Sequence, residues 1–90
     1  MEFEWDAKKA AENVRKHDDT FQEAATIFCD PLAITFDDPD HSANETRHIS
    51  FGLSLRKRLL VVSHTQRGEK IRIISARLMS RKERRIYEEG

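Results

Sequence analysis

Apolar residues recur along the chain with two spacings: every three to four residues in some segments, and every second residue in others. The first spacing indicates an amphipathic helix and the second a half-buried strand. Residues 3–6 alternate and predict a short strand. Residues 7–17 carry the helical spacing, and Asp6 stands where a helix N-cap is preferred. The apolar stripe of this first helix is formed by Ala7, Ala10, Ala11 and Val14.

A second helix is predicted to follow almost at once. Thr20 and Glu23 have the spacing of a capping box, in which each side chain caps the backbone N–H of the other residue. Pro31 blocks continuation of this helix and favours an extended Asp30. The buried face of the second helix is predicted to consist of Phe21, Ala24, Ala25, Ile27 and Phe28.

Four strands and a final helix are predicted in the remainder of the chain. The strands are expected at residues 32–38, 47–54, 58–66 and 71–77. In the first of them Leu32, Ile34 and Phe36 alternate, whereas residues 58–66 are apolar on both faces and should form a central strand. Ser80 with Glu83 is a second capping box, and it should open a helix that runs to the chain end.

The predicted order is therefore β-α-α-β-β-β-β-α in one domain spanning residues 1–90. Short connections between the last four strands favour an antiparallel meander. The two N-terminal helices should cover one face of that antiparallel sheet, and the C-terminal helix completes an α+β fold.

Charge is divided unevenly along the chain, although the formal net charge is zero. Residues 1–45 hold 4 Lys/Arg and 12 Asp/Glu, and residues 46–90 hold 12 Lys/Arg and 4 Asp/Glu. The halves thus carry formal charges of −8 and +8. One interpretation is a basic face turned toward a polyanion or an acidic protein. The other is that the two halves neutralise each other within the fold.

Several classes of site and location find no support in the sequence. The four histidines lack the close spacing of a zinc site, and His41 lies in an acidic loop without the pattern of a calcium loop. We therefore predict no metal and no cofactor. The single Cys29 excludes an intramolecular disulfide. No apolar run is long enough to span a membrane, and the acidic start is unlike a signal peptide, so a cytoplasmic protein is expected.

The basic second half carries the candidate chemistry. Arginine matches phosphate geometry with two parallel donors. RNA can be cut without a metal by a base that takes the proton of the 2′-OH, cations that stabilise the phosphorane charge, and an acid that protonates the leaving oxygen. The candidate side chains come from three predicted strands and the last helix: Arg47, His48, His64, Arg67, Arg72, Arg77, Arg81, Arg84 and Arg85.

Strand parity separates two of these arginines. Arg72 and Arg77 are five residues apart and would point to opposite faces of a regular strand. Either a bulge aligns them, or only one of them lines a given site. Each could instead form a structural ion pair with an N-terminal acid, because a buried unpaired charge is costly.

The last helix also has two interpretations. After Met79 its only large apolar residues are Ile86 and Tyr87, which is a thin anchor. It is either an ordinary solvated amphipathic helix or a helix whose basic face joins the binding surface.

Several stretches together resemble the BrnT family of toxins over nearly the whole chain. The most specific are the opening "FEWD" with the later "KH", the "DP" after the second helix, and "RIISAR" followed by "ERRIY". The resemblance implies a RelE-like fold and a type II toxin that cuts RNA without a metal and inhibits translation. Its family positions match Lys16, His17, Glu45, Arg47, Arg72, Ser75, Arg77, Arg81, Glu83 and Tyr87.

Roles follow from the resemblance as hypotheses. Catalysis is assigned to phosphate-binding arginines and to two proton-transfer candidates, namely Arg47, Arg72, Arg77, His17 and Glu45. RNA binding is assigned to Lys16, His64, Arg67, Arg81, Arg84, Arg85 and Tyr87. Of these, Lys16, Arg81 and Tyr87 stand at matching family positions, and the others come from the basic second half of the chain. Asp18 and Asp19 stand where the family tends to have a glycine-containing turn.

The resemblance also implies partners. A BrnA-like antitoxin of the ribbon–helix–helix class should bind the toxin, and operator DNA should be contacted only through that complex. A membrane partner is not expected. The alternative function is a non-catalytic module, an inactive toxin or co-repressor, that binds nucleic acid or antitoxin through the same basic face.

Overall fold

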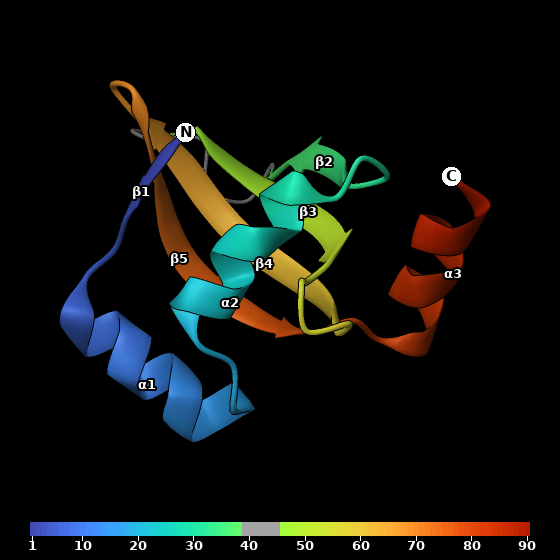
Figure 1. Ribbon diagram of the computed structural model, residues 1–90, viewed down its shortest axis with the longest axis horizontal. Coiled ribbons are helices and arrows are strands. Elements are labelled where there is room, and N and C mark those ends of the chain that lie inside the picture. The colour runs from blue at the N-terminus through green and yellow to red at the C-terminus, as the bar shows by residue number, and fades with distance from the viewer. Residues whose placement is uncertain (39–45) are drawn as a thin grey trace.

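The computed structural model describes residues 1–38 and 46–90. Its elements, in chain order (Figure 1), are β1 (Glu2–Glu4), α1 (Ala7–His17), α2 (Phe21–Ala25), the 3₁₀ helix η1 (Thr26–Cys29), β2 (Ile34–Asp37), β3 (Arg47–Leu53), β4 (Leu59–Arg67), β5 (Lys70–Leu78) and α3 (Arg81–Glu89). The predicted order of strands and helices is confirmed. The second predicted helix divides, because its last turn tightens into η1.

The two predicted capping boxes differ in outcome. Ser80 and Glu83 form a complete box at the start of α3. At the start of α2 the Thr20 hydroxyl accepts from the Glu23 N–H, at 3.0 Å. The Glu23 carboxylate does not complete the box but accepts from the Ser54 hydroxyl, at 2.7 Å. The prediction of a reciprocal box at Thr20 is therefore wrong, because Glu23 turns toward the segment between β3 and β4.

The strands form one sheet in the order β1-β5-β4-β3-β2. Strands β2 to β5 are an antiparallel meander, as predicted, and β4 lies at the centre. The short β1 pairs with β5 in parallel, so the prediction of a wholly antiparallel sheet is corrected. This pairing covers only the three positions Lys70 to Arg72, and the rest of β5 extends beyond it.

One predicted strand begins later than expected. Leu32 was predicted to start the strand, but it is 69% exposed and precedes β2. The Asp30 carboxylate accepts from the Leu32 N–H, at 2.9 Å, and the Asp30 carbonyl accepts from the Ala33 N–H. These local bonds hold a turn across Pro31 before the chain becomes extended.

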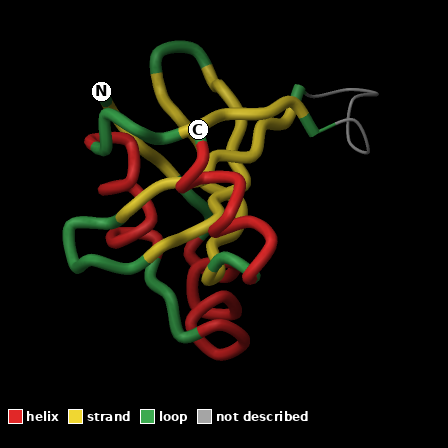
Figure 2. The backbone as a smooth tube through the Cα atoms, turned by 90° about the vertical axis from the view of Figure 1, so that its right-hand side faces the viewer, coloured by secondary structure: helices red, strands yellow, loops and turns green. Residues whose placement is uncertain are grey.

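Helices pack on both faces of the sheet around Leu60, Val61 and Val62, which accounts for the apolar pattern on both faces of β4 there. One face, the helical face, packs on α1, α2 and η1 through Phe21, Ala24, Ile27, Leu60, Val62, Ile73 and Ala76. The other packs on α3 through Phe51, Val61 and Met79, with Tyr87 of α3 against them. Figure 1 shows α2 crossing in front of β4 and β5 with α3 to the right, and Figure 2 shows helices around the strand layer. The α+β prediction is confirmed.

Asn13 of α1 supplies the edge of β5 with the partner that β1 is too short to provide. Its amide nitrogen donates to the Ala76 carbonyl, at 2.8 Å, and its amide oxygen accepts from the Ala76 N–H, at 3.0 Å. The same nitrogen donates to the Asp19 carbonyl, at 2.8 Å. Because buried backbone groups are costly to leave unpaired, Asn13 fixes the distance between α1 and β5.

Candidate functional site

A bulge in β5 decides on which side its two arginines lie. Ser63 pairs with Ser75 and His64 with Ile73, so Ile74 is an extra residue opposite β4. One extra residue reverses the alternation that a regular strand would have. Arg72 and Arg77 therefore lie on the same face of the sheet, the face that packs on α3.

Cross-strand rows show what surrounds these arginines. At one end of the face the row is Arg47, Thr65, Arg72 and Glu4, contributed by β3, β4, β5 and β1. The next row is Ile49, Ser63 and Ser75, and the third is Phe51, Val61 and Arg77. The apolar contacts of α3 centre on the third row, and Glu83 of α3 binds Arg77 at its edge. In the first two rows Ser63, Arg72 and Ser75 stay partly exposed. We call Arg47, Ser63, Thr65, Arg72, Ser75 and Arg77 the arginine face.

The arginine face has cations at its ends and short side chains between them. Arg72 and Arg77 pair with Thr65 and Val61, which are four residues apart on β4. That spacing is about 13 Å along a strand. The hydroxyls of Ser63 and Ser75 lie between, where larger side chains would fill the surface. An extended anionic backbone fits this arrangement better than a compact ligand does.

Two acids hold the arginines in place. Arg72 Nη1 donates to Glu4 Oε2, at 2.8 Å, so the alternative of a pair with an N-terminal acid is realised. Arg77 makes a two-pronged pair with Glu83 of α3, at 2.8 and 2.9 Å. These bonds lower the pKa of Glu83 to about 2 and raise the pKa of Arg77. A guanidinium has five N–H donors, so each arginine keeps donors for a further ligand.

A groove of about 240 Å³ adjoins the arginine face along the edge of β5. We call it the α1–β5 groove; it is lined by Lys9, Glu12, Asn13, Lys16, His17, Ile74 and Ser75. Ser75 belongs to both surfaces, because it lies next to the bulge. The structure thus brings the predicted residues Lys16 and His17 beside the strand that carries Arg72 and Arg77.

Sequence reasoning left out Lys9, Ser63 and Thr65. Lys9 precedes Lys16 by seven residues, two helical turns, so the two lysines share a face of α1. That spacing was a usable signal. Ser63 interrupts the apolar run of β4, but the sequence alone could not say that it lies between two arginines.

His64 is not brought together with the arginines. It lies on the helical face, buried, with its Nε2 atom 2.7 Å from the Ser50 hydroxyl. The Ser50 hydroxyl in turn lies 2.8 Å from the Thr35 hydroxyl. Burial, followed by the neighbouring His48, lowers the pKa of His64 to about 4. A buried imidazole without charge is a poor ligand for phosphate, because it offers neither access nor a positive charge. RNA binding by His64 therefore has no geometric support.

The remaining predicted residues lie around α3 and at strand ends. Tyr87 donates its hydroxyl to Asp30 Oδ2, at 2.5 Å, and burial together with this bond raises the pKa of Tyr87 to about 12. Tyr87 therefore anchors α3. Ile86 is 39% exposed and contributes less to the anchor than expected. The exposed predicted cations are Arg67 at the end of β4 and Arg81, Arg84 and Arg85 on α3. Glu45 lies outside the described residues.

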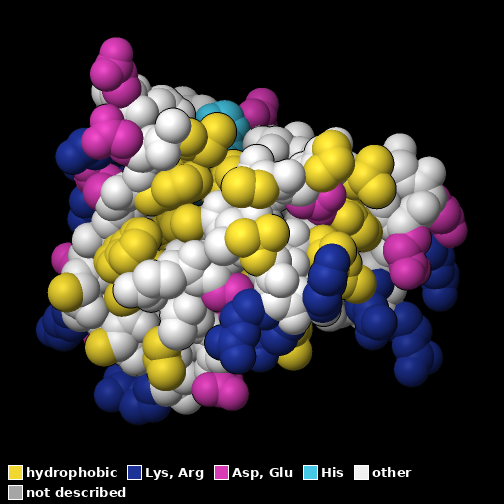
Figure 3. All heavy atoms as spheres, viewed as in Figure 1, with side chains coloured by type: hydrophobic (Ala, Val, Ile, Leu, Met, Phe, Trp, Pro, Cys, Tyr) yellow, Lys and Arg dark blue, Asp and Glu magenta, His cyan; other side chains and the backbone are white. Residues whose placement is uncertain are grey.

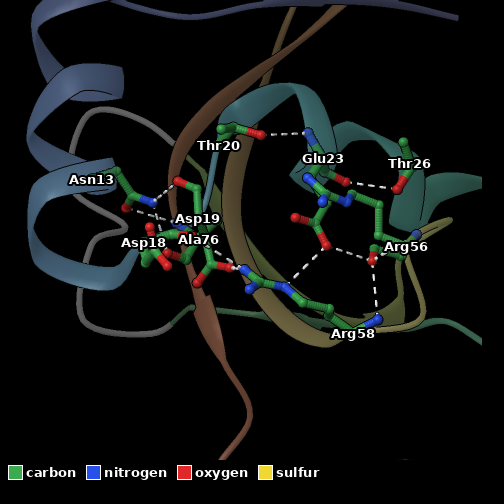
Figure 4. Close-up of polar contacts among 10 residues, drawn as sticks. Asn13, Asp18, Asp19, Thr20, Glu23, Thr26, Arg56, Arg58 and Ala76 are labelled. Carbon is green, nitrogen blue, oxygen red and sulfur yellow. Dashed lines mark hydrogen bonds and ion pairs between the residues drawn. The ribbon is translucent and has the colours of Figure 1, made fainter.

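The charge division along the sequence is partly cancelled in space. Arg58 of the basic half binds Asp19 and Glu23 of the acidic half, and Arg72 binds Glu4. Figure 4 shows the Arg58 guanidinium between α2 and the start of β4, close to the end of α1. Lys and Arg side chains that remain at the surface gather along the lower edge of the view in Figure 3. Neutralisation within the fold is thus confirmed for these pairs, whereas a basic face turned toward an anionic partner stays a prediction.

Comparisons with known proteins identify the family of this chain. The sequence model of a family described as "Ribonuclease toxin, BrnT, of type II toxin-antitoxin system" matches residues 5–83. The chain belongs to the BrnT family. The predicted resemblance is thereby confirmed, and the family as described is one of ribonuclease toxins in type II toxin–antitoxin systems.

A solved structure supports the fold of this BrnT-family chain. The ribonuclease toxin BrnT of Brucella abortus, from a crystal structure at 1.1 Å resolution, matches with a TM-score of 0.69 and 23% sequence identity. The match covers 90% of this chain and 99% of that chain. A search of curated proteins found no match.

In residues 1–38 and 46–90, no helix is long and apolar enough to cross a membrane. The same residues contain no cluster of three or more His, Cys, Asp or Glu side chains that could hold a metal ion.

Proposed function

We propose that this chain is a ribonuclease toxin that cuts RNA on the arginine face, without a metal, and thereby inhibits translation. One observation supports this proposal above the others. The bulge at Ile74 puts Arg72 and Arg77 on one open face, next to the α1–β5 groove that holds His17 and Lys16. Membership of a family of ribonuclease toxins gives this constellation its substrate class.

The chemistry needs a proton acceptor and a positive field around one phosphate. In the proposed complex the phosphate lies over Ser63 and Ser75, and Arg72 and Arg77 stabilise the charge that develops on its oxygens. His17, in the adjoining groove, takes or gives the proton of a ribose hydroxyl. Attack of the 2′-oxygen on phosphorus breaks the bond to the 5′-oxygen and leaves a 2′,3′-cyclic phosphate. Glu45 is the candidate for the other proton transfer, so that the 2′-hydroxyl loses one proton and the departing 5′-oxygen gains one.

The proposed partner is a BrnA-like antitoxin of the ribbon–helix–helix class. The family belongs to type II systems, in which the toxin is held by a protein antitoxin. The antitoxin would contact operator DNA, and the toxin would act as a co-repressor within that complex.

RNA cleavage in the presence of EDTA tests the catalytic proposal. The wild-type protein should release fragments that end in 2′,3′-cyclic phosphate. Arg77→Ala should slow cleavage about 100-fold or more, because removing one donor to a developing oxyanion commonly costs that much. Arg15→Ala is the matched control: Arg15 is an exposed arginine of α1 that does not line the groove. Cleavage that stops in EDTA, or that Arg77→Ala leaves intact, would contradict the proposal.

The non-catalytic alternative is supported by one observation. Glu4 and Glu83 already occupy donors of Arg72 and Arg77, as purely structural pairs would. A binding module of this kind would leave RNA intact and would not arrest growth when it is expressed alone. Growth of induced cells, compared between wild type and Arg77→Ala, separates the two functions.

A further inference from the structure

A second hollow lies at the opposite end of β5 from its pairing with β1. We call it the α3 pocket; it has a volume of about 250 Å³ and is lined by Lys57, Arg58, Leu59, Leu78, Met79 and Arg84. It joins the turn between β3 and β4 to the start of α3. None of its lining residues belongs to the arginine face or to the α1–β5 groove.

Three cations line the α3 pocket, and among the described residues two of them, Lys57 and Arg84, have no acidic partner. Arg58 is neutralised by Asp19 and Glu23, so its charge is satisfied inside the protein. Lys57 and Arg84 are exposed, and within the described part of the chain neither side chain forms an ion pair. Below them Leu59, Leu78 and Met79 supply an apolar floor, and Leu78 is 53% exposed. The α3 pocket thus combines an apolar floor with two exposed cations, which is complementary to an apolar side chain that has carboxylates beside it.

We propose that the α3 pocket anchors the antitoxin, through an aliphatic side chain that is flanked by acidic residues in an antitoxin segment. The aliphatic group would bury the floor, and the acids would pair with Lys57 and Arg84. This inference rests on the proposed toxin function, and it names where the partner of that function binds.

The lining chemistry favours this peptide over RNA. Single-stranded RNA is usually held by aromatic side chains that stack on bases and by polar side chains that read base edges. The α3 pocket has no aromatic residue and no Asn, Gln, Ser or Thr among its lining residues. Its leucines and methionine match an aliphatic side chain, and its two cations match carboxylates.

The position of the α3 pocket also suits inhibition. Leu78 follows Arg77 directly, and an Arg77 nitrogen donates to the Leu78 carbonyl, at 3.2 Å. Arg84 lies on the helix whose Glu83 holds Arg77. A segment seated in the pocket therefore lies at the end of β5 that carries Arg77, and a continuation of that segment around the strand end would cover Arg77 and exclude RNA.

Calorimetry tests the proposal with an antitoxin that is identified as a neighbouring reading frame whose co-expression neutralises this toxin. Lys57→Glu and Leu78→Asp should each weaken binding at least tenfold, whereas Lys57→Arg should bind like the wild type. Lys82→Glu is the matched control, because Lys82 and Arg84 lie on opposite flanks of α3 and Lys82 does not line the pocket. Lys82→Glu should change affinity less than twofold.

RNA cleavage by the same preparations separates the possible outcomes. Lys57→Glu should cut RNA at the wild-type rate while resisting the antitoxin, which would support the proposal and show that the variant is folded. Unchanged affinity in both Lys57→Glu and Leu78→Asp would overturn it. Loss of cleavage with intact antitoxin binding would assign the pocket to RNA instead. A wild-type protein that binds the antitoxin but does not cut RNA would contradict the proposed function alone, and one that binds no antitoxin would overturn this inference.

Discussion

At the scale of single residues, face and burial decide which charged side chains can act on a ligand. His64 and Arg72 lie on adjacent strands at neighbouring positions, yet they lie on opposite faces of the sheet. His64 is enclosed by Phe28, Ser50 and His48, whereas Arg72 lies on the open arginine face. The basic character of the second half of the sequence could not reveal this difference, because it depends on register.

The buried His64 should make stability depend on pH. Its pKa is about 4 in the folded protein, compared with 6.5 for an ordinary histidine. Between these values the unfolded chain binds a proton that the folded protein does not, so stability is full above pH 6.5 and falls as the pH falls toward 4. A shift of this size corresponds to at most about 3 kcal/mol, and solvent screening reduces it.

Urea unfolding at pH 7.5 and pH 5 measures this effect in a range where most carboxylates stay ionised. The His64→Gln variant should lose much of the difference between the two pH values. His17→Gln is the control, since His17 is exposed at the end of α1. Equal pH dependence in the wild type and His64→Gln would show that His64 does not carry the effect.

At the scale of elements, alternation predicted where the strands lie but not how they meet. The apolar pattern on both faces of residues 58–66 placed β4 at the sheet centre correctly. The bulge at Ile74 has no marker in the sequence, because Ile is an ordinary strand residue and no Gly or Pro stands nearby. The parallel pairing of β1 with β5 could not be predicted either, because these two strands lie at opposite ends of the sequence and their pairing depends on the whole fold. The common face of Arg72 and Arg77 was therefore left open between two alternatives.

The junction of α1 and α2 gives a prediction about a single backbone position. Asp18 ends α1 with a φ of 58°, in the left-handed region. Glycine adopts this conformation without the cost that a side chain imposes, and a glycine-containing turn is what the family resemblance implied here. Asp18→Gly should therefore stabilise the protein by about 0.5–1 kcal/mol, and Asp18→Ala should not.

Thermal and urea unfolding of these two variants would check the backbone argument. The bond from Arg58 to this residue goes to the Asp18 carbonyl, which both variants keep. The comparison of Gly with Ala therefore isolates the backbone conformation from the loss of the carboxylate. If both variants were destabilised equally, the carboxylate rather than the left-handed backbone would be the important feature.

At the scale of the whole molecule, the two halves of the sequence interleave rather than separate. The pairs Arg58–Asp19, Arg58–Glu23 and Arg72–Glu4 each join the basic half to the acidic half. Composition alone was compatible with both neutralisation within the fold and a basic surface. It could not say which cations are paired and which stay exposed, because pairing depends on which strands become neighbours. The cations that stay exposed include those of α3, the end of α1, Lys57 between β3 and β4, and Arg67 at the end of β4.

RNA binding should consequently depend on salt, and its dependence should report which cations touch phosphates. For single strands the slope of log K against log salt is about −0.7 for each phosphate contact, so three or four contacts give about −2 to −3. The measurement is fluorescence anisotropy with a 2′-O-methyl RNA, which cannot be cut by attack of a 2′-hydroxyl. Arg72→Gln should weaken binding and make the slope shallower by about 0.7.

Glu4, which forms an ion pair with Arg72, provides a variant whose expected effect on RNA affinity is opposite to that of Arg72→Gln. Glu4→Gln removes the carboxylate that competes with RNA for Arg72, at 2.8 Å in this structure. It should therefore tighten binding and leave the slope at least as steep as in the wild type. Arg15→Gln removes an equal charge elsewhere and should leave the slope nearly unchanged. If Arg72→Gln and Arg15→Gln weakened binding equally, RNA would sense only the overall charge of the molecule. An opposite response to Glu4→Gln and Arg72→Gln would place an RNA phosphate at Arg72.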